Sequence, residues 1–268
     1  QLSPYDFWDR ATSAKESYRE KTKFGVSGDE STITYAEVKN FLKLSLEKLD
    51  SGIKKAWNEG KNVISTYFIS EVVNYKEIEY TSPEGEKTLK CNPKGLLCFR
   101  AKKFNHKHLP LFLEGPVHYL RSRPGNKEAK TLVNNIRNSG LYDKKLKMYK
   151  VNESLSDQPH EIGRARTFSP GWFENESVWL HMEYKYMLEL LRNGLYTEFF
   201  QDFKNVFIPF LKPEIYGRSI LENSSFICSS GNPDPSIHGN GFVARLSGAT
   251  AEFIHILMQM TVGANPFD

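Results

Sequence analysis

The 268-residue sequence predicts a mainly α-helical protein with a small β-hairpin or meander inserted at residues 62–104. One observation behind this prediction is that apolar residues recur at spacings of three and four over most of the chain, as on the buried face of a helix. A second is that the spacing changes to two within residues 62–104, as in a strand. The length suits one large domain, so we predict a single helical domain over residues 1–268.

Helices are expected on both sides of the insertion. The segment 32–58 is the clearest, because Ser31 or Thr32 can cap a helix there and the apolar residues that follow form one stripe. Inside the insertion, a Ser-Pro-Glu-Gly turn at residues 82–85 separates strand-like segments. The other helices predicted in the first half lie at residues 11–19, 109–121 and 126–138.

The most informative segment starts at Arg166. It begins as a loop, because Pro170 and Gly171 interrupt regular structure, and continues as a helix predicted over residues 176–192. Apolar residues occupy every face of this helix, so we expect it to be buried on all sides. Two later helices are predicted at residues 196–211 and 251–262, and the last is also expected to be buried.

The composition argues against several classes of function. With 36 basic and 32 acidic residues, the net charge of +4 gives no reason to expect a nucleic-acid partner, and no apolar run reaches the length of a membrane span. Cys91, Cys98 and Cys228 are odd in number and lack metal-ligand spacing, which favours a reducing, cytoplasmic setting without a metal or cofactor. Because the chain does not start with Met, we expect a fragment or a processed piece.

Glu174 and His181 flank the start of the predicted central helix. A buried carboxylate and a buried imidazole need a partner, a ligand or a cavity, and a histidine near a helix N-terminus can contact an anion. The aromatic residues around them, including Trp172, favour a sugar site, because sugars stack on such rings. The alternative is a capping carboxylate with a hydrogen-bonded core histidine.

Ser247 and Gly248 precede the last predicted helix. A serine and a glycine at this place expose a hydroxyl and backbone amides at the positive end of the helix, an arrangement that binds phosphate. The lysine and glycine spacing of a Walker loop is absent. The alternative is an ordinary serine N-cap.

Near the start of the chain, Asp6 and Asp9 enclose Phe7 and Trp8. Neighbouring rings can desolvate a carboxyl group and raise its pKa, as a general acid requires. The alternative is a surface turn with a capping aspartate. The sequence contains neither HExxH nor GxSxG, so a protease or a zinc site is not predicted.

These three stretches resemble motifs of the cellobiose phosphorylases and their relatives acting on other β-glucans, which form glycoside hydrolase family ninety-four and neighbouring families. The family's Glu-Asn-x-x-x-x-x-His motif corresponds to Glu174–His181, with the same spacing. Its Thr-Gly pair corresponds to Ser247-Gly248, and its Asp-Trp-Asn-Asp motif to Asp6-Phe7-Trp8-Asp9. The interval from Asp9 to Glu174 is also close to that of the family.

The resemblance covers roughly the whole chain, but only the second half of a phosphorylase catalytic domain. The family usually has two glycines after Glu-Asn, where Glu176 and Ser177 stand here, and Phe7 and Trp8 replace Trp and Asn. These departures predict a distant branch. In the family, the phosphate-contacting arginine and most of the donor-sugar subsite lie further upstream.

The resemblance implies an enzyme, an inverting phosphorylase that cleaves a β-linked glucan or disaccharide with inorganic phosphate to give α-glucose 1-phosphate. The implied fold is part of an (α/α)6 toroid. Fewer helices are expected than a closed toroid needs, so exposed apolar helix faces, a homodimer or completion by a missing N-terminal part are expected. The implied roles are general acid for Asp9, phosphate binding for His181, Ser247 and Gly248, and sugar binding for Glu174, Trp172 and Phe7.

Two alternatives stay open. The first is an inverting glycoside hydrolase on the same toroid, which needs a second carboxylate to activate water. Glu176, Glu183 and Glu222 are candidates for that base. The second alternative is a non-catalytic carbohydrate-binding fragment.

Overall fold

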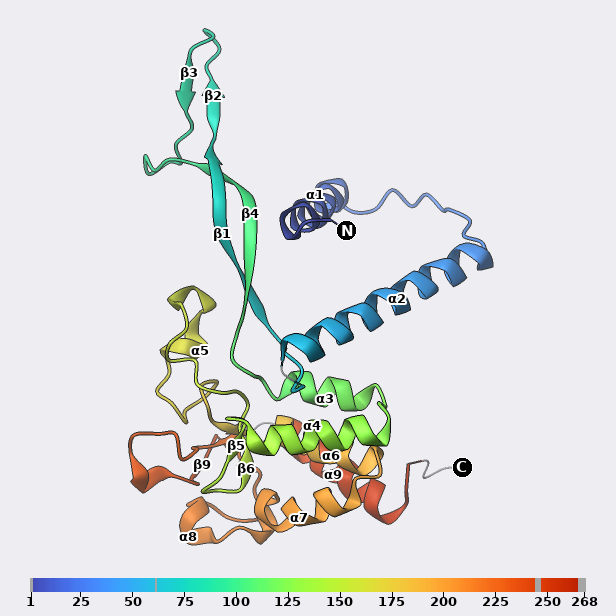
Figure 1. The fold of residues 1–268 in the computed structure, drawn as a ribbon, viewed down its shortest axis with the longest axis vertical. Coiled ribbons are helices and arrows are strands. Elements are labelled where there is room, and N and C mark those ends of the chain that lie inside the picture. Colours follow the sequence, from blue (N-terminus) through green and yellow to red (C-terminus); the bar gives the residue numbers. More distant parts are fainter. Residues whose placement is uncertain (1, 61, 244–246, 265–268) are drawn as a thin grey trace. The chain divides into compact units, whose positions relative to one another are not determined.

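A computed structural model describes residues 2–60, 62–243 and 247–264 of the chain (Figure 1). Helices form 47% of the structure and the sheets are small, so the prediction of a mainly α-helical protein is confirmed. The chain folds as two compact units. We call them the hairpin unit, residues 1–45 and 68–107, and the helical unit, residues 46–67 and 108–268.

Helix α1 (Pro4–Thr22) opens the hairpin unit. Ser3 caps it, because its hydroxyl oxygen accepts a hydrogen bond from the backbone N–H of Asp6 at 3.1 Å, and a proline suits the first helical position. This cap starts the helix well before the segment that the sequence predicted. Trp8 of this helix packs edge-on against Phe104, a residue of the strand at Phe99–His108, with ring centroids 5.5 Å apart.

Helix α2 (Tyr35–Glu59) contributes residues to both units. It starts with a capping box, in which the Thr34 hydroxyl accepts from the Glu37 backbone N–H at 3.2 Å and the Glu37 carboxylate accepts from the Thr34 N–H at 2.8 Å. The cap places the first helical residue three positions later than the predicted segment 32–58. The helix itself is present as predicted.

The strands of the hairpin unit form a long ribbon (Figure 1). A turn at its tip contains Gly85 with a φ of 88°, a left-handed conformation that glycine adopts without strain. Strands therefore occupy the segment in which the spacing of apolar residues is two, and they continue a few residues beyond it. β1 (Phe68–Glu77) pairs with β4 (Phe99–His108), and β2 (Glu79–Thr81) pairs antiparallel with β3 (Lys87–Leu89).

The helical unit is built around α6, which packs against α3, α7 and α9 (Figure 1). Its longer helices are α3 (Glu114–Arg121), α4 (Asn126–Asn138), α6 (Leu180–Arg192), α7 (Tyr196–Val206) and α9 (Ser247–Thr261). The short helices are α5 (Arg164–Thr167) and α8 (Pro213–Tyr216), with single turns of 3-10 helix at His160–Ile162, Ile208–Phe210 and Pro235–Ile237.

Two small antiparallel sheets complete the helical unit. In the larger one, Trp179 lies opposite Phe226, and Phe226 lies opposite Phe242. Its first strand runs directly into α6, so the helix begins at Leu180 rather than at the predicted Glu176. The strands are β5 (Tyr142–Asp143) with β6 (Met148–Tyr149), and β7 (Val178–Trp179), β8 (Phe226–Ile227) and β9 (Gly241–Phe242).

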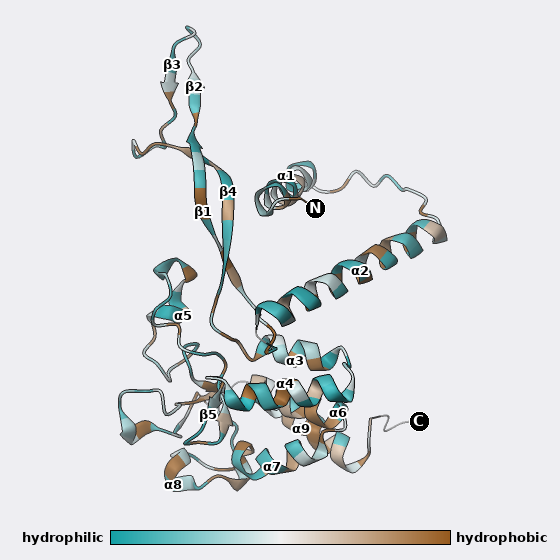
Figure 2. Cartoon of the chain, viewed as in Figure 1, coloured by the Kyte–Doolittle hydropathy of each residue, from teal (hydrophilic) through white to brown (hydrophobic). Residues whose placement is uncertain are grey.

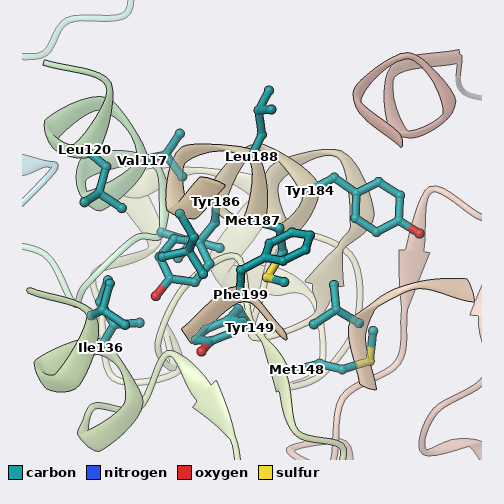
Figure 3. Packing of buried hydrophobic residues seen from close by; sticks show 14 of the residues in the cluster. Val117, Leu120, Ile136, Met148, Tyr149, Tyr184, Tyr186, Met187, Leu188 and Phe199 are labelled. Atoms are coloured by element: carbon teal, nitrogen blue, oxygen red, sulfur yellow. The ribbon is translucent and has the colours of Figure 1, made fainter. Parts of the chain in front are cut away.

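The hydrophobic core surrounds α6 (Figure 3). Tyr149 of β6 packs on Tyr186 of α6, with ring centroids 4.6 Å apart. The predicted burial of this helix is confirmed for most of its surface, and the partly exposed residues are His181, Met182, Lys185 and Arg192. Its fully buried residues include Leu180, Tyr184, Tyr186, Met187, Leu188 and Leu190.

Helix α9 differs from its prediction in burial. Ala249 and Ile256 face the core, but much of the apolar surface of the helix is exposed, and Figure 2 shows this helix to be rich in hydrophobic residues. The prediction that this helix is buried is therefore wrong. Its exposed face matches the expectation of uncovered apolar helix surfaces. The large apolar residues exposed on α9 are Ile254, Leu257, Met258 and Met260, and Val262 directly after the helix is also exposed.

A buried polar network lies beside this core. The Asp202 carboxylate accepts from Arg137 at 2.7 Å and from the Tyr149 hydroxyl at 2.6 Å. Glu183 accepts from the Tyr149 backbone N–H at 2.7 Å, and no described residue donates to its other oxygen. Burial raises the pKa of Glu183 well above its usual value, and the charges of Asp202 and Asp143 raise it further.

We predict that Glu183→Gln removes a pH-dependent cost to folding. The raised folded-state pKa means that the folded protein binds more protons than the unfolded chain above pH 4.5, so wild-type stability falls as the pH rises from there. The slope is about 1.4 kcal/mol per pH unit until the folded-state pKa is reached. Glutamine keeps the acceptor for Tyr149 and cannot ionise.

Urea unfolding of both proteins between pH 4 and pH 7 measures this effect. The free energy of unfolding of Glu183→Gln should rise relative to wild type as the pH increases. Glu161→Gln, at an exposed position, serves as the control and should follow wild type. If the free energy of unfolding changed with pH in the same way for wild type and Glu183→Gln, Glu183 would be ionised in the folded protein.

Candidate anion and sugar site in the helical unit

His181 and Gly248 lie next to each other. They are the second residues of α6 and α9, two helices that pack together. A Cβ atom built on Gly248 would lie 3.6 Å from the Cβ of His181. Two of the three stretches that the sequence singled out therefore meet in the helical unit.

The end of α9 beside His181 is its N-terminus, which begins at Ser247. The first amides of a helix have no acceptor within the helix and form its positive end. Gly248 is exposed and carries no side chain that would block these amides. Residues 244–246 and the side chain of Ser247 lie outside the described part of the chain, so the role of the hydroxyl at 247 stays a prediction.

The His181 imidazole is half-buried and lies edge-on to Trp179, with ring centroids 5.8 Å apart. Burial lowers its pKa, and the positive charge of Lys185 lowers it further, while Glu114 of α3 acts in the opposite direction. The ring is therefore mainly neutral at pH 7. It offers an N–H donor to an anion rather than a full positive charge.

Lys185 is a second candidate for anion contact, and the sequence analysis missed it. It lies one helical turn after His181, is half-buried, and its charge reaches the imidazole. No carboxylate in the described part of the chain forms an ion pair with it. The spacing of four residues from His181 on one helix is the signal that could have identified it.

We predict that Lys185→Met raises the pKa of His181 and that Glu114→Gln lowers it, because each change removes one of the two charges that act on the ring. Titration of the imidazole signals by NMR measures both shifts. Lys204→Met, an exposed change on α7, serves as the control and should leave the pKa of His181 unchanged. Equal titration curves for Lys185→Met and wild type would remove Lys185 from the site.

Glu174 lies at the tip of a tight turn. Trp172 and Asn175 exchange backbone hydrogen bonds of 3.1 Å, and Phe173 between them has a φ of 45°. One oxygen of the Glu174 carboxylate accepts from Arg164. The other is buried, and no described residue donates to it. Buried acceptors are rarely left unpaired, and this oxygen is an unsatisfied acceptor of the described structure.

Two buried asparagines fix the backbone around Glu174. Asn175, the second residue of the Glu-Asn motif, bonds two backbone groups through its side-chain amide, at 3.1 and 2.8 Å. Asn152 donates to the Glu174 carbonyl and accepts from the Glu176 N–H at 2.8 Å. The asparagine of the motif is therefore structural. Sequence reasoning did not identify Asn152, because it is distant from the motif in the chain.

Glu176 adopts a left-handed backbone with a φ of 63°. This conformation favours glycine, and Glu176 stands where the phosphorylase family usually has one. Its side chain forms an ion pair with Lys150 at 2.7 Å, with both side chains mostly buried at 13% and 12% exposure. The ion pair explains how a glutamate is held in this left-handed conformation.

We predict that Glu176→Gly destabilises the protein. The glycine relieves about 1 kcal/mol of backbone strain, but it leaves the buried ammonium of Lys150 without its partner, which costs about 3 kcal/mol. Adding Lys150→Met should restore the free energy of unfolding to the wild-type value or above it. A double-mutant cycle of Glu176→Gly and Lys150→Met, followed by urea unfolding, measures the contribution of the ion pair to the free energy of unfolding. A stabilised Glu176→Gly single variant would show that the ion pair contributes less than the strain.

Trp172 belongs to a cluster of aromatic rings. Its centroid lies 5.2 Å from that of Phe226 and 4.5 Å from that of Phe242, and Phe173 stacks on Phe168 at 4.9 Å. The indole N–H of Trp179 donates to the Phe173 carbonyl at 2.8 Å, which links the Glu174 turn to the ring beside His181. Trp172 is partly exposed, so some of its surface is accessible to a ligand.

Asp9 and Phe7 belong to the hairpin unit, whereas Glu174, His181 and Gly248 belong to the helical unit. Asp9 lies on α1, and its carboxylate is 3.8 Å from the guanidinium of Arg100. Phe7 and Trp8 are each about half exposed, so within their own unit they do not enclose the carboxylate. The general-acid role of Asp9 stays a prediction.

The three carboxylates considered as a hydrolytic base have different surroundings. Glu183 is fully buried in the core and has no access to solvent. Glu176 is paired with Lys150, as described above. Glu222 is exposed and lies 3.5 Å from Arg218. Neither Glu183 nor Glu176 is therefore positioned as a free carboxylate that activates water.

Comparisons with known proteins do not assign the chain. No protein-family model matches it, and a search of curated proteins found no match. Within the described residues, no group of three or more His, Cys, Asp or Glu side chains is arranged to hold a metal ion. No helix in the same part of the chain combines the length and apolarity needed to cross a bilayer.

Proposed function

We propose that the protein is an inverting glycoside phosphorylase that cleaves a β-linked glucan or disaccharide with inorganic phosphate to give α-glucose 1-phosphate. The single observation that carries the proposal is the contact of His181 with the N-terminal turn of α9 at Gly248. An imidazole N–H, the N-terminal amides of α9 and the charge of Lys185 would together form a site for an oxyanion. The spacing of the Glu-Asn and His motif adds to this support.

In the proposed reaction, phosphate attacks the anomeric carbon as the glycosidic bond breaks on the opposite face of the sugar. Asp9 gives its proton to the leaving oxygen, and the phosphate oxygen forms the new bond. An inverting phosphorylase needs only this one acid, because its nucleophile is already an anion, whereas a hydrolase also needs a base for water. Ser247 and Gly248 would hold phosphate with His181, and Glu174, Trp172 and Phe7 would contact the sugar.

The proposal includes a fold assignment. In the helical unit, α6 packs against α7, the helix that follows it, and the exposed apolar face of α9 suits a neighbouring helix of an (α/α)6 toroid. Further helices or a second copy of the chain would cover it. Cys91, Cys98 and Cys228 are all free thiols, which supports the proposal of a reducing, cytoplasmic setting. A soluble glucan and phosphate are the proposed partners, with no cofactor, nucleic acid or membrane.

We predict that the purified protein releases α-glucose 1-phosphate from a β-glucan oligosaccharide or disaccharide only when phosphate is present. Asp9→Asn should abolish release, because it removes the proton donor. Lys185→Met and Gly248→Ala should raise the KM for phosphate about tenfold, which corresponds to about 1.4 kcal/mol. The added methyl group of Gly248→Ala fits beside His181 at an ordinary contact distance, so the fold should survive.

Lys204→Met, on the exposed side of α7, is the matched control for Lys185→Met and should leave the KM for phosphate unchanged. Sugar release at the same rate without phosphate would favour the hydrolase. Sugar binding without turnover under either condition would favour a non-catalytic carbohydrate-binding protein. Full activity of Asp9→Asn would remove Asp9 from the acid role.

A further inference from the structure

A tight turn after α2 places Ser65 beside the end of that helix. The backbone N–H groups of Gly60 and Ser65 both donate to the Ala56 carbonyl, at 2.9 and 3.0 Å. A Cβ atom on Gly60 would lie 2.4 Å from the Ser65 nitrogen, so only glycine allows the chain to fold back this closely. The turn therefore brings Ser65 next to Glu59, the last residue of α2.

The backbone just before Ser65 is strained. Ile64 has a φ of 26° and Asn62 a φ of 65°, and a positive φ is a true outlier for a β-branched residue. Such strain costs about 1–3 kcal/mol and persists where the surroundings enforce it, often at functional sites. In the α/β-hydrolases the nucleophilic serine also sits on a sharp, strained turn, although that turn joins a strand to a helix.

Ser65, His108 and Glu59 lie in a row within the helical unit, joined by one hydrogen bond and one ion-pair contact. The Ser65 hydroxyl oxygen lies 2.9 Å from Nδ1 of His108, and Nε2 of His108 lies 3.0 Å from a carboxylate oxygen of Glu59. If Nε2 carries the ring proton, its N–H is on the side of Glu59 and Nδ1 accepts from the hydroxyl. A serine, a base that accepts its proton and a carboxylate that orients the base are the parts of a nucleophilic triad.

These three side chains line a cavity of about 490 Å³. Val63, Leu109 and Pro110 supply apolar surface to it, and Asn135, Asn138 and Ser139 supply polar groups. A volume of this size is typical of small-molecule sites. No Phe, Tyr or Trp is among the described residues that line it, which distinguishes this cavity from the surroundings of His181.

We propose that Ser65, His108 and Glu59 form a second active site, which hydrolyses esters of short carboxylic acids by acyl transfer. The Ser65 oxygen bonds to the acyl carbon and its proton passes to Nδ1 of His108. The bond to the alcohol then breaks, and the alcohol takes that proton. Water attacks the acyl-serine and gives a proton to Nδ1. The acid leaves and the Ser65 oxygen is reprotonated.

The cavity also contains donors for the negative charge that develops on the acyl oxygen. Asn135 donates one amide hydrogen to the Asn62 carbonyl at 3.1 Å, and Asn138 donates one to the Asn134 carbonyl at 2.9 Å. Each side-chain amide carries a second hydrogen. Fixed amide donors are the usual means of stabilising such an oxyanion. Their own hydrogen bonds hold both asparagines in place before a substrate arrives.

The experiment treats the intact chain with an alkyl fluorophosphonate, which forms a covalent bond with activated serines, and with 4-nitrophenyl acetate. We expect one adduct per chain, located on Ser65 by peptide mass spectrometry, and release of nitrophenol. Ser65→Ala should abolish both. His108→Gln should slow both about a hundredfold or more, because it removes the base. Glu59→Gln should slow the labelling and the release of nitrophenol, and the adduct should still form on Ser65.

Ser139→Ala is the matched control, because Ser139 lines the same cavity but donates its hydroxyl to the Ile136 carbonyl at 2.8 Å. It should be labelled at the wild-type rate. Circular dichroism and thermal unfolding test whether each variant is folded. An unlabelled Ser65 in the folded wild-type protein would overturn the proposal. So would folded Ser65→Ala that still releases nitrophenol at the wild-type rate. Neither outcome depends on phosphorolysis.

Discussion

The burial of α6 is the constraint on which the helical unit depends. A helix that is packed by α3, α7 and α9 cannot rotate about its axis without exposing apolar side chains, and each buried leucine or methionine contributes about 2 kcal/mol. Its direction and register are therefore fixed. His181 lies in its first turn, so the core determines where the imidazole lies and which end of α9 it meets.

The loops around this helix are held by polar groups rather than by apolar packing. Asn152 and Asn175 bond the backbone on both sides of Glu174, and Lys150 pairs with Glu176. These bonds hold Phe173 and Glu176 in left-handed conformations that an unconstrained chain would leave. The backbone of this turn is therefore preorganised, and the Glu174 carboxylate that it carries is paired with Arg164.

The sequence predicted those features that depend on local patterns. Helix α4 was predicted with its observed ends, because its apolar spacing and flanking residues agree. The start of α6 was not, because Val178 and Trp179 pair with β8, a contact that the local pattern does not contain. The exposure of α9 was missed for a related reason. An apolar pattern predicts that a face should be covered and does not say whether a covering segment is present.

In the candidate sites too, the residues that belong to a local pattern could be predicted, and those that depend on contacts distant in the chain could not. The spacing between Glu174 and His181 could be recognised in the sequence, and so could the pair Ser247-Gly248. Glu59, Ser65 and His108 could not, because no local motif connects a helix end, a strained turn and the end of a strand. Asn152 and Lys150 were missed for the same reason, since their partners are distant in the chain.

The distribution of charge explains why an anion would be drawn to α9. Arg137 is paired with Asp202, Lys150 with Glu176, and Arg164 with Glu174, so these cations are already neutralised. Lys185 has no such partner among the described residues, and it lies within reach of His181. An ammonium group, a neutral imidazole and a helix N-terminus each attract an anion weakly, and under the proposed function all three would act on one bound phosphate. Recognition would then rest on the convergence of three modest effects rather than on one arginine.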